Sequence, residues 1–164
     1  MNNQEIERKF LVTDAQKIIA ASTTHYEIIQ GYICRLPGRT VRIRHCAKSM
    51  GEQTACMTIK AAPKHADSFT RFEWEKAITT EDFRALLPLC DGAPIIKTRY
   101  IIPATTCNQA GKELKWEVDI FHGKWEGLIM AEIELPAEDT PFDHPSWLGE
   151  EVTHDPRYYN ANMR

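Results

Sequence analysis

The chain has 164 residues, of which 43% are hydrophobic and 26% charged, so it can form one sizeable core and is predicted to be a single domain over residues 1–164. The net charge of −3 at pH 7 excludes a general nucleic-acid binder, because such proteins are usually strongly basic. No apolar run approaches the roughly 20 residues that span a bilayer, and residues 1–10 lack the apolar centre of a signal peptide. We therefore expect a cytoplasmic protein without a membrane partner.

The cysteines and histidines form no metal or disulfide pattern. The five cysteines are odd in number, and none lies in a C-x-x-C spacing. The six histidines include no pair at the i, i+4 spacing of a helical metal site. We expect reduced cysteines and no histidine-based metal site.

Eight segments alternate between apolar and polar residues, the period of two that is typical of strands. Turn residues separate several of them, at Pro37-Gly38, at Gly51 and between Pro63 and Ser68. These short connections predict hairpins and a mainly β, antiparallel fold. The segments are 5–12, 28–34, 39–46, 54–60, 70–77, 95–102, 113–121 and 128–135.

Two short helices are predicted between these strands. Asp14 is a good N-cap for a helix that runs to Ala20. A second helix begins after Thr79 or Thr80, and Pro88 ends it.

The tail from Pro136 onward is rich in proline and acidic residues. It contains Trp147-Leu148 and Tyr158-Tyr159-Asn160. We expect them on one or two short helices packed outside the sheet.

One face of almost every predicted strand carries charged residues. In the first strand, Glu5, Glu7 and Lys9 are two residues apart and therefore share a face. For any single strand, an ordinary solvated face is the simpler interpretation. Like charges recur at i, i+2 in several strands, however, and this arrangement is repulsive unless a ligand lies between them. The charged set is Glu5, Glu7, Glu73, Glu75, Glu117, Asp119, Glu132, Glu134, Lys9, Arg42, Arg44, Lys60, Arg71, Lys97, Arg99 and Lys115.

The opposite, strongly apolar faces need the helices and the tail as cover, so we expect the charged faces to point inward. Eight antiparallel strands can close into a barrel whose interior holds side chains or one small ligand. Burying unpaired charges is unfavourable, so such an interior must be wet, ion-paired and suited to a polyvalent ligand. A phosphate compound with Mg²⁺ or Mn²⁺ would compensate the side chains of both charges. Arginine and lysine bind phosphate oxygens, and carboxylates bind hard cations.

The order of these residues resembles the CYTH superfamily, also called triphosphate tunnel metalloenzymes, whose hallmark is an N-terminal E-x-E-x-K strand. That motif reads Glu5-Ile-Glu7-Arg-Lys9 in this sequence. The resemblance covers essentially the whole chain. It continues through QGYI at 30–33, VRIR at 41–44, TIK at 58–60, RFEWE at 71–75, KTRY at 97–100, WEVDIFHG at 116–123, GLIMAEIEL at 127–135 and the DPRYYN ending.

The resemblance implies a division of labour on the charged face. The basic residues bind the phosphates, four carboxylates hold one or more Mg²⁺ or Mn²⁺ ions, and four further acids orient these groups. The phosphate-binding residues are Arg42, Arg44, Lys60, Arg71, Lys97 and Arg99, the metal ligands are Glu5, Glu7, Glu132 and Glu134, and the supporting acids are Glu73, Glu75, Glu117 and Asp119.

The resemblance also implies a catalytic dyad of Lys9 and Tyr32, which would help to activate the attacking water. We expect neighbouring cations to lower the pKa of Lys9, so that a neutral amine accepts a proton directly or through Tyr32. The alternative is that both residues only position phosphate.

The function implied is metal-dependent hydrolysis of inorganic triphosphate to pyrophosphate and phosphate, by a monomer or homodimer whose partner is the small-molecule triphosphate. A class IV adenylate cyclase would hold ATP similarly but direct the ribose hydroxyl at the α-phosphorus. Thiamine triphosphatase is a third possibility. A noncatalytic barrel that binds polyphosphate or nucleotides is the alternative from a different class.

Overall fold

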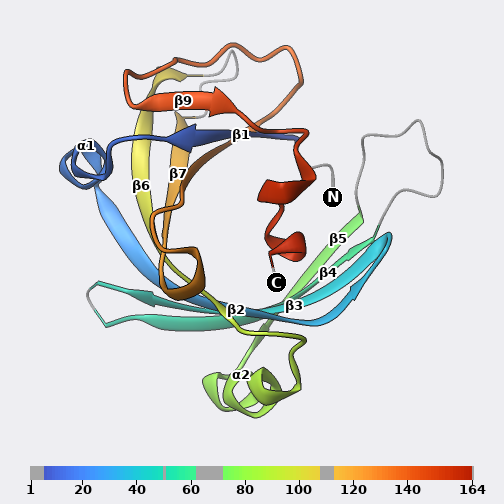
Figure 1. Ribbon diagram of the computed structural model, residues 1–164. Helices are drawn as coiled ribbons and strands as arrows, with labels where there is room; N and C mark the ends of the chain where they lie inside the picture. The colour runs from blue at the N-terminus through green and yellow to red at the C-terminus, as the bar shows by residue number, and fades with distance from the viewer. Residues whose placement is uncertain (1–5, 50, 62–71, 108–112, 164) are drawn as a thin grey trace. The chain divides into compact units, whose positions relative to one another are not determined.

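A computed structural model of the protein describes residues 6–49, 51–61, 72–107 and 113–163 (Figure 1). The chain is mainly β, with two short α-helices, α1 (Ala15–Ala21) and α2 (Thr80–Leu86). Within these ranges, no helix is long and apolar enough to cross a membrane. The strands are β1 (Ile6–Val12), β2 (Thr24–Leu36), β3 (Arg39–Lys48), β4 (Gln53–Ala61), β5 (Phe72–Ile78), β6 (Ile95–Cys107), β7 (Glu113–Phe121), β8 (Ile129–Leu135) and β9 (Leu148–Glu151).

The nine strands form one antiparallel sheet with the order β5-β4-β3-β2-β6-β7-β8-β1-β9. All eight strand segments predicted from the alternation are confirmed as far as the described residues reach, and β9 is an addition. The turn predicted between Pro63 and Ser68 lies outside the described residues. Among the described residues, the hydrogen-bonded order ends at β5 and at β9, and no hydrogen bonds close the sheet. Closure into an eight-stranded barrel is therefore not confirmed and stays a prediction.

The chain divides into two compact units. Of the described residues, those from Glu27 to Ile96 and from Arg157 to Met163 form the first unit, and those in Ile6–Tyr26 and Lys97–Pro156 form the second. Each unit has its own buried apolar cluster on one face of its strands. The charged residues of the same strands alternate with that apolar set, as the sequence predicted.

Helix α2 covers the apolar face of β3 and β4 in the first unit. Thr79 Oγ1 accepts a hydrogen bond from Asp82 N, and the Asp82 carboxylate accepts one from Thr79 N, which makes a capping box. Phe83 of α2 is buried and packs with Ile43 and Ala55. The predicted second helix, capped by Thr79, is confirmed.

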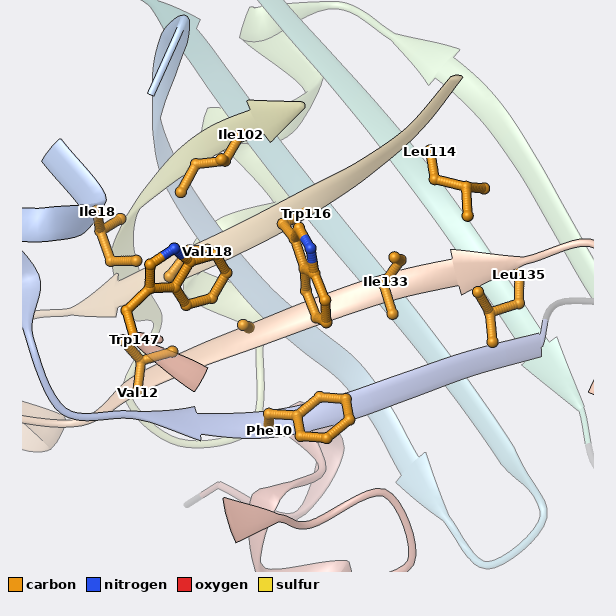
Figure 2. Close-up of a cluster of buried hydrophobic side chains, with 11 residues drawn as sticks. Phe10, Val12, Ile18, Ile102, Leu114, Trp116, Val118, Ile133, Leu135 and Trp147 are labelled. Carbon is orange, nitrogen blue, oxygen red and sulfur yellow. The ribbon is translucent and has the colours of Figure 1, made fainter. Parts of the chain in front are cut away.

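A larger core in the second unit surrounds Trp116 of β7 (Figure 2). The Trp116 ring is fully buried, and its centroid lies 5.8 Å from that of Phe10 and 5.5 Å from that of Trp147. Helix α1 adds Ile18, and Asp14 caps it by accepting hydrogen bonds from two main-chain N–H groups. The first predicted helix is confirmed, and the helix and the tail cover the apolar face as expected.

The tail differs from the sequence prediction at Trp147-Leu148. The prediction of a helix there is wrong, because Leu148–Glu151 form β9 and pair with β1 (Figure 1). The edge of β1 offers main-chain donors and acceptors that an added strand satisfies and a helix would not. Further along, short 3₁₀ turns at Pro156–Tyr158 and Asn160–Asn162 agree with the helical turns expected near the end of the chain.

Candidate active site

The charged face of the second unit is built by the register of β1, β7 and β8. Glu7 lies opposite Glu134, and Glu132 lies opposite both Lys9 and Glu117. Carboxylates that face each other directly are unfavourable unless cations lie among them. We call this set the acidic cluster. Its members are Glu7, Lys9, Lys97, Arg99, Lys115, Glu117, Asp119, Glu132 and Glu134.

Lys9 bridges two of these carboxylates. Its Nζ lies 2.8 Å from Glu132 Oε1 and 3.1 Å from Glu7 Oε1, and its side chain is 10% exposed. Burial acts to lower the pKa of Lys9, but the attraction of Glu132 and Glu7 outweighs it and raises the pKa above its usual value. The prediction of a lowered pKa is wrong, because the nearest charged groups are carboxylates and not cations.

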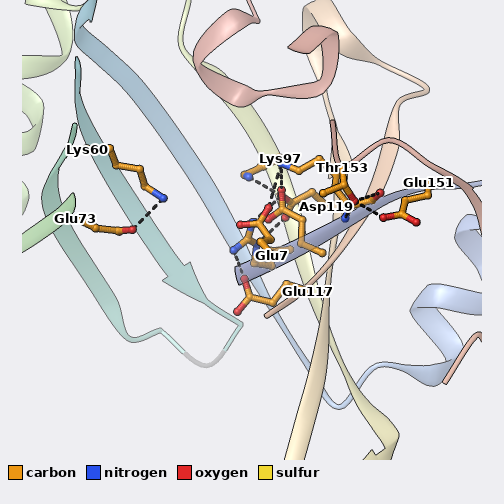
Figure 3. Close-up of polar contacts among 11 residues, drawn as sticks. Glu7, Lys60, Glu73, Lys97, Glu117, Asp119, Glu151 and Thr153 are labelled. Atoms are coloured by element: carbon orange, nitrogen blue, oxygen red, sulfur yellow. Dashed lines mark hydrogen bonds and ion pairs between the residues drawn. The ribbon is translucent and has the colours of Figure 1, made fainter. Parts of the chain in front are cut away.

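Asp119 holds the two cations of β6. It is 1% exposed and accepts hydrogen bonds from Lys97 Nζ at 2.5 Å and from Arg99 Nε and Nη2, both at 2.7 Å (Figure 3). Arg99 also pairs with Glu117 and, at 3.3 Å, with Glu132. Burial opposes ionisation of Asp119, but Arg99 and Lys97 lower its pKa on balance. These contacts fix both cations on the charged face.

The first unit carries a second charged face on β3, β4 and β5. Arg42 Nη2 donates to Thr58 Oγ1 at 3.1 Å, and that buried hydroxyl donates to Glu75 Oε2 at 2.8 Å. Arg44 Nη2 lies 3.5 Å from the same carboxylate oxygen, so two arginines share one acid. We call this set the basic cluster. Its members are Arg42, Arg44, Thr58, Lys60, Glu73 and Glu75, and Lys60 pairs with Glu73 at 3.0 Å (Figure 3).

The two clusters differ in charge balance. Among the described residues, the basic cluster has three cations for two carboxylates, whereas the acidic cluster has five carboxylates for four cations. Arg42 Nε is buried and donates no hydrogen bond within the described ranges. The basic cluster therefore has donor capacity for an anion, and the acidic cluster has carboxylate capacity for a cation.

The family model of the CYTH domain matches residues 3–159. The chain belongs to the CYTH family. The predicted family is confirmed, and the charged faces described above are those of a CYTH domain.

Relatives of this CYTH chain are similar over nearly their full length. A protein from Acetivibrio thermocellus named inorganic triphosphatase is 36% identical over 162 residues, which cover 98% of this chain and 92% of the relative. A second inorganic triphosphatase, from Nitrosomonas europaea, is 32% identical over 97% of this chain and 95% of its own length. A crystal structure of the inorganic triphosphatase NE1496 matches with a TM-score of 0.59 at 30% identity, covering 97% of this chain and 93% of that one.

The carboxylates of this CYTH domain fit a hard divalent cation in their chemistry. Glu134 is exposed and Glu7, directly opposite, is 30% exposed, so both present oxygen ligands of the kind that Mg²⁺ and Mn²⁺ prefer. Glu132 is more buried and is engaged by Lys9 and Arg99. The described residues contain no complete group of three or more His, Cys, Asp or Glu that would hold a metal. A metal role of Glu7 and Glu134 therefore stays a prediction.

The remaining predicted site residues fall in different parts of the chain. Glu5 and Arg71 lie outside the described residues. Tyr32 is buried in the first unit, where the Arg35 guanidinium lies 4.6 Å from its ring centroid, whereas Lys9 belongs to the second unit. The Lys9 and Tyr32 dyad therefore stays a prediction.

Sequence reasoning missed Thr58, whose hydroxyl joins Arg42 to Glu75. The available signal was its position two residues before Lys60, which places both on the charged face of β4. A threonine is common on any strand, so that signal becomes informative only when the register with β3 and β5 is known.

Proposed function

We propose that this CYTH protein is an inorganic triphosphatase that hydrolyses tripolyphosphate to pyrophosphate and phosphate with Mg²⁺ or Mn²⁺. The observation that carries the proposal is the near full-length similarity to two proteins named inorganic triphosphatase. The charge of the two clusters supports it, because one has spare cationic donors and the other has spare carboxylates.

Phosphate oxygens are bound by the basic residues in this proposal. A phosphate oxygen would accept from the buried Arg42 Nε, which has no acceptor within the described ranges. Asp119 would keep Lys97 and Arg99 aimed at the same ligand. The phosphate-binding set remains the predicted one, Arg42, Arg44, Lys60, Arg71, Lys97 and Arg99.

Divalent metal would be held by Glu7 and Glu134, completed by Glu5 and Glu132. A metal bound there would offset the negative charge of the phosphate oxygens and so favour attack of a nucleophile at phosphorus. Glu117, Glu73 and Glu75, like Asp119, would orient the cations that they already contact.

Water is the proposed nucleophile, attacking in line at the terminal phosphorus, and no covalent intermediate is required. Lys9 lies between Glu7 and Glu132. The alternative to a catalytic role is that Lys9 and Tyr32 only position phosphate. Activation of the water by Lys9 with Tyr32 remains a prediction.

We further propose that the two charged faces line the interior of a closed barrel, in a cytoplasmic protein. Support comes from the apolar face of each unit, which is already covered by α1, α2 and the tail. A charged face that is withdrawn from bulk water needs a ligand of opposite charge to compensate it.

Two single substitutions test the proposal. Glu7→Ala and Arg44→Ala should each lower kcat/KM for tripolyphosphate by at least about 100-fold. Arg44→Ala removes a cation that stabilises the transferring phosphoryl group, and Glu7→Ala removes a ligand of the divalent metal that does the same. The matched controls are Glu81→Ala and Arg84→Ala on α2, whose side chains are 78% and 69% exposed. Full activity of either cluster variant, with a circular dichroism spectrum like that of wild type, would contradict the proposed site.

A further inference from the structure

The segment that follows β9 is anchored to the main chain of Lys9. Val152 N donates to Lys9 O at 2.8 Å, and Lys9 N donates to Thr153 Oγ1 at 3.0 Å. In an antiparallel ladder, the N–H of Lys9 would normally bond a carbonyl of the neighbouring strand. The ladder of β9 ends at Glu151, so the Thr153 hydroxyl takes the place of that carbonyl.

This anchor shows which type of strand pair Lys9 makes with β8. The N–H and C=O of Lys9 both point toward the segment 151–153, so its pairing with Glu132 on the other side is a non-hydrogen-bonded pair. Side chains approach more closely in such pairs. The 2.8 Å contact between Lys9 Nζ and Glu132 Oε1 is the result.

The Thr153 hydroxyl is itself held by an ion pair on the opposite face of β1. It donates to Glu151 Oε1 at 2.6 Å (Figure 3). The Glu151 carboxylate accepts from Arg8 Nε at 2.5 Å and from Arg8 Nη2 at 2.7 Å. Arg8 directly precedes Lys9, so the contacts form a closed circuit of four residues around one peptide. The circuit fixes the hydroxyl so that its lone pair faces Lys9 N.

We propose that Thr153 is a positioning residue for Lys9. By holding the Lys9 main chain from the β9 edge of β1, it sets where the ammonium group lies between Glu7 and Glu132. This inference rests on the proposed function, because it requires Lys9 to take part in phosphate turnover. Small displacements of a catalytic group are costly, and a shift of about 1 Å lowers rates by roughly 100-fold in well-oriented sites.

Thr153→Val and Thr153→Ser separate positioning from packing. Valine keeps the shape of threonine but removes the acceptor, and we expect kcat for tripolyphosphate to fall about tenfold with KM changed less than about threefold. Serine keeps the hydroxyl and should retain kcat within about twofold. Thr140→Val is the matched control, because Thr140 Oγ1 also accepts a main-chain N–H, from Ala137 at 3.2 Å, but Thr140 lies in the connection between β8 and β9 and belongs to neither cluster.

A second readout does not depend on activity. Hydrogen exchange of the Lys9 amide, followed by NMR, should be slow in wild type and in Thr153→Ser and faster in Thr153→Val, relative to the Phe10 amide. Wild-type protein that fails to hydrolyse tripolyphosphate would overturn the proposed function, whatever the exchange data show. In an active enzyme, unchanged kcat in folded Thr153→Val would overturn the positioning role, as would Lys9 exchange equal to that of wild type.

Discussion

At Lys9, the neighbourhood of one side chain is decided by strand register and not by local sequence. The i, i+2 pattern correctly places Glu7 and Lys9 on one face, but it does not show that Glu132 lies directly opposite. The contact with Glu132 reverses the expected direction of the Lys9 pKa shift. Charge type was thus predictable from the sequence, whereas the electrostatic environment depended on long-range pairing.

Asp119 is the residue whose loss should damage the acidic cluster most. Asp119→Asn removes the negative charge between buried Lys97 and Arg99. Lys97 loses its ion pair with Asp119, whereas Arg99 keeps Glu117 and Glu132. We expect the free energy of unfolding to fall by about 3–5 kcal/mol, the range for breaking a buried ion pair. Urea denaturation measures the change.

Lys115→Met is the control for this prediction, because Lys115 is 58% exposed and pairs with Glu117 near the surface. It should change stability by no more than about 0.5 kcal/mol. Equal effects of Asp119→Asn and Lys115→Met would show that burial does not distinguish the two pairs.

At the scale of elements, β2 passes so close to the turn after α2 that only a glycine fits at Gly31, in the QGYI motif. A Cβ at Gly31 would lie 2.5 Å from Cys90 Sγ and 3.0 Å from Cys90 Cβ. Gly31→Ala should therefore destabilise the protein by about 1–3 kcal/mol, the usual effect of overpacking. Thermal unfolding of Gly31→Ala and of Gly31→Ala with Cys90→Ala tests this. The double variant should recover part of the loss, and no recovery would exclude Cys90 as the obstacle.

The ion pair between Arg8 of β1 and Glu151 of β9 predicts how the stability of the protein depends on pH. Hydrogen bonds from Arg8, chiefly, lower the pKa of Glu151 from 4.5 to about 2. A carboxylate with a lowered folded-state pKa contributes stability that is complete above its unfolded pKa and is lost as pH falls through its folded pKa. The stability difference between wild type and Glu151→Gln should therefore be constant above pH 5 and shrink between about pH 4.5 and 2. Urea unfolding at several pH values measures it, and a difference that grows toward pH 2 would contradict the assignment.

The strands, both α-helices and their caps were predictable because each depends on a few neighbouring residues. Asp14 and Thr79 mark helix starts directly in the sequence, and alternation marks the strands. β9 was missed because Leu148–Glu151 is four residues long and is a strand only through pairing with β1. The role of Thr153 was hidden for the same reason, since its partner Lys9 is 144 residues away.

For the whole molecule, two kinds of observation support the proposed triphosphatase activity. One charged face has an excess of cations and the other an excess of carboxylates, and two CYTH relatives are named inorganic triphosphatase. A binding protein with the same clusters would hold tripolyphosphate without breaking it. A class IV adenylate cyclase would release pyrophosphate and cyclic AMP from ATP, and a thiamine triphosphatase would prefer its own substrate. These outcomes differ in products, so the products decide among them.

The most direct measurement is ³¹P NMR of tripolyphosphate incubated with the protein and Mg²⁺ or Mn²⁺, with parallel samples of ATP and thiamine triphosphate. We predict equal amounts of pyrophosphate and phosphate from tripolyphosphate, at a rate well above those for the other two compounds. Addition of EDTA should stop the reaction. Tripolyphosphate that binds but remains intact, or cyclic AMP formed from ATP, would contradict the account.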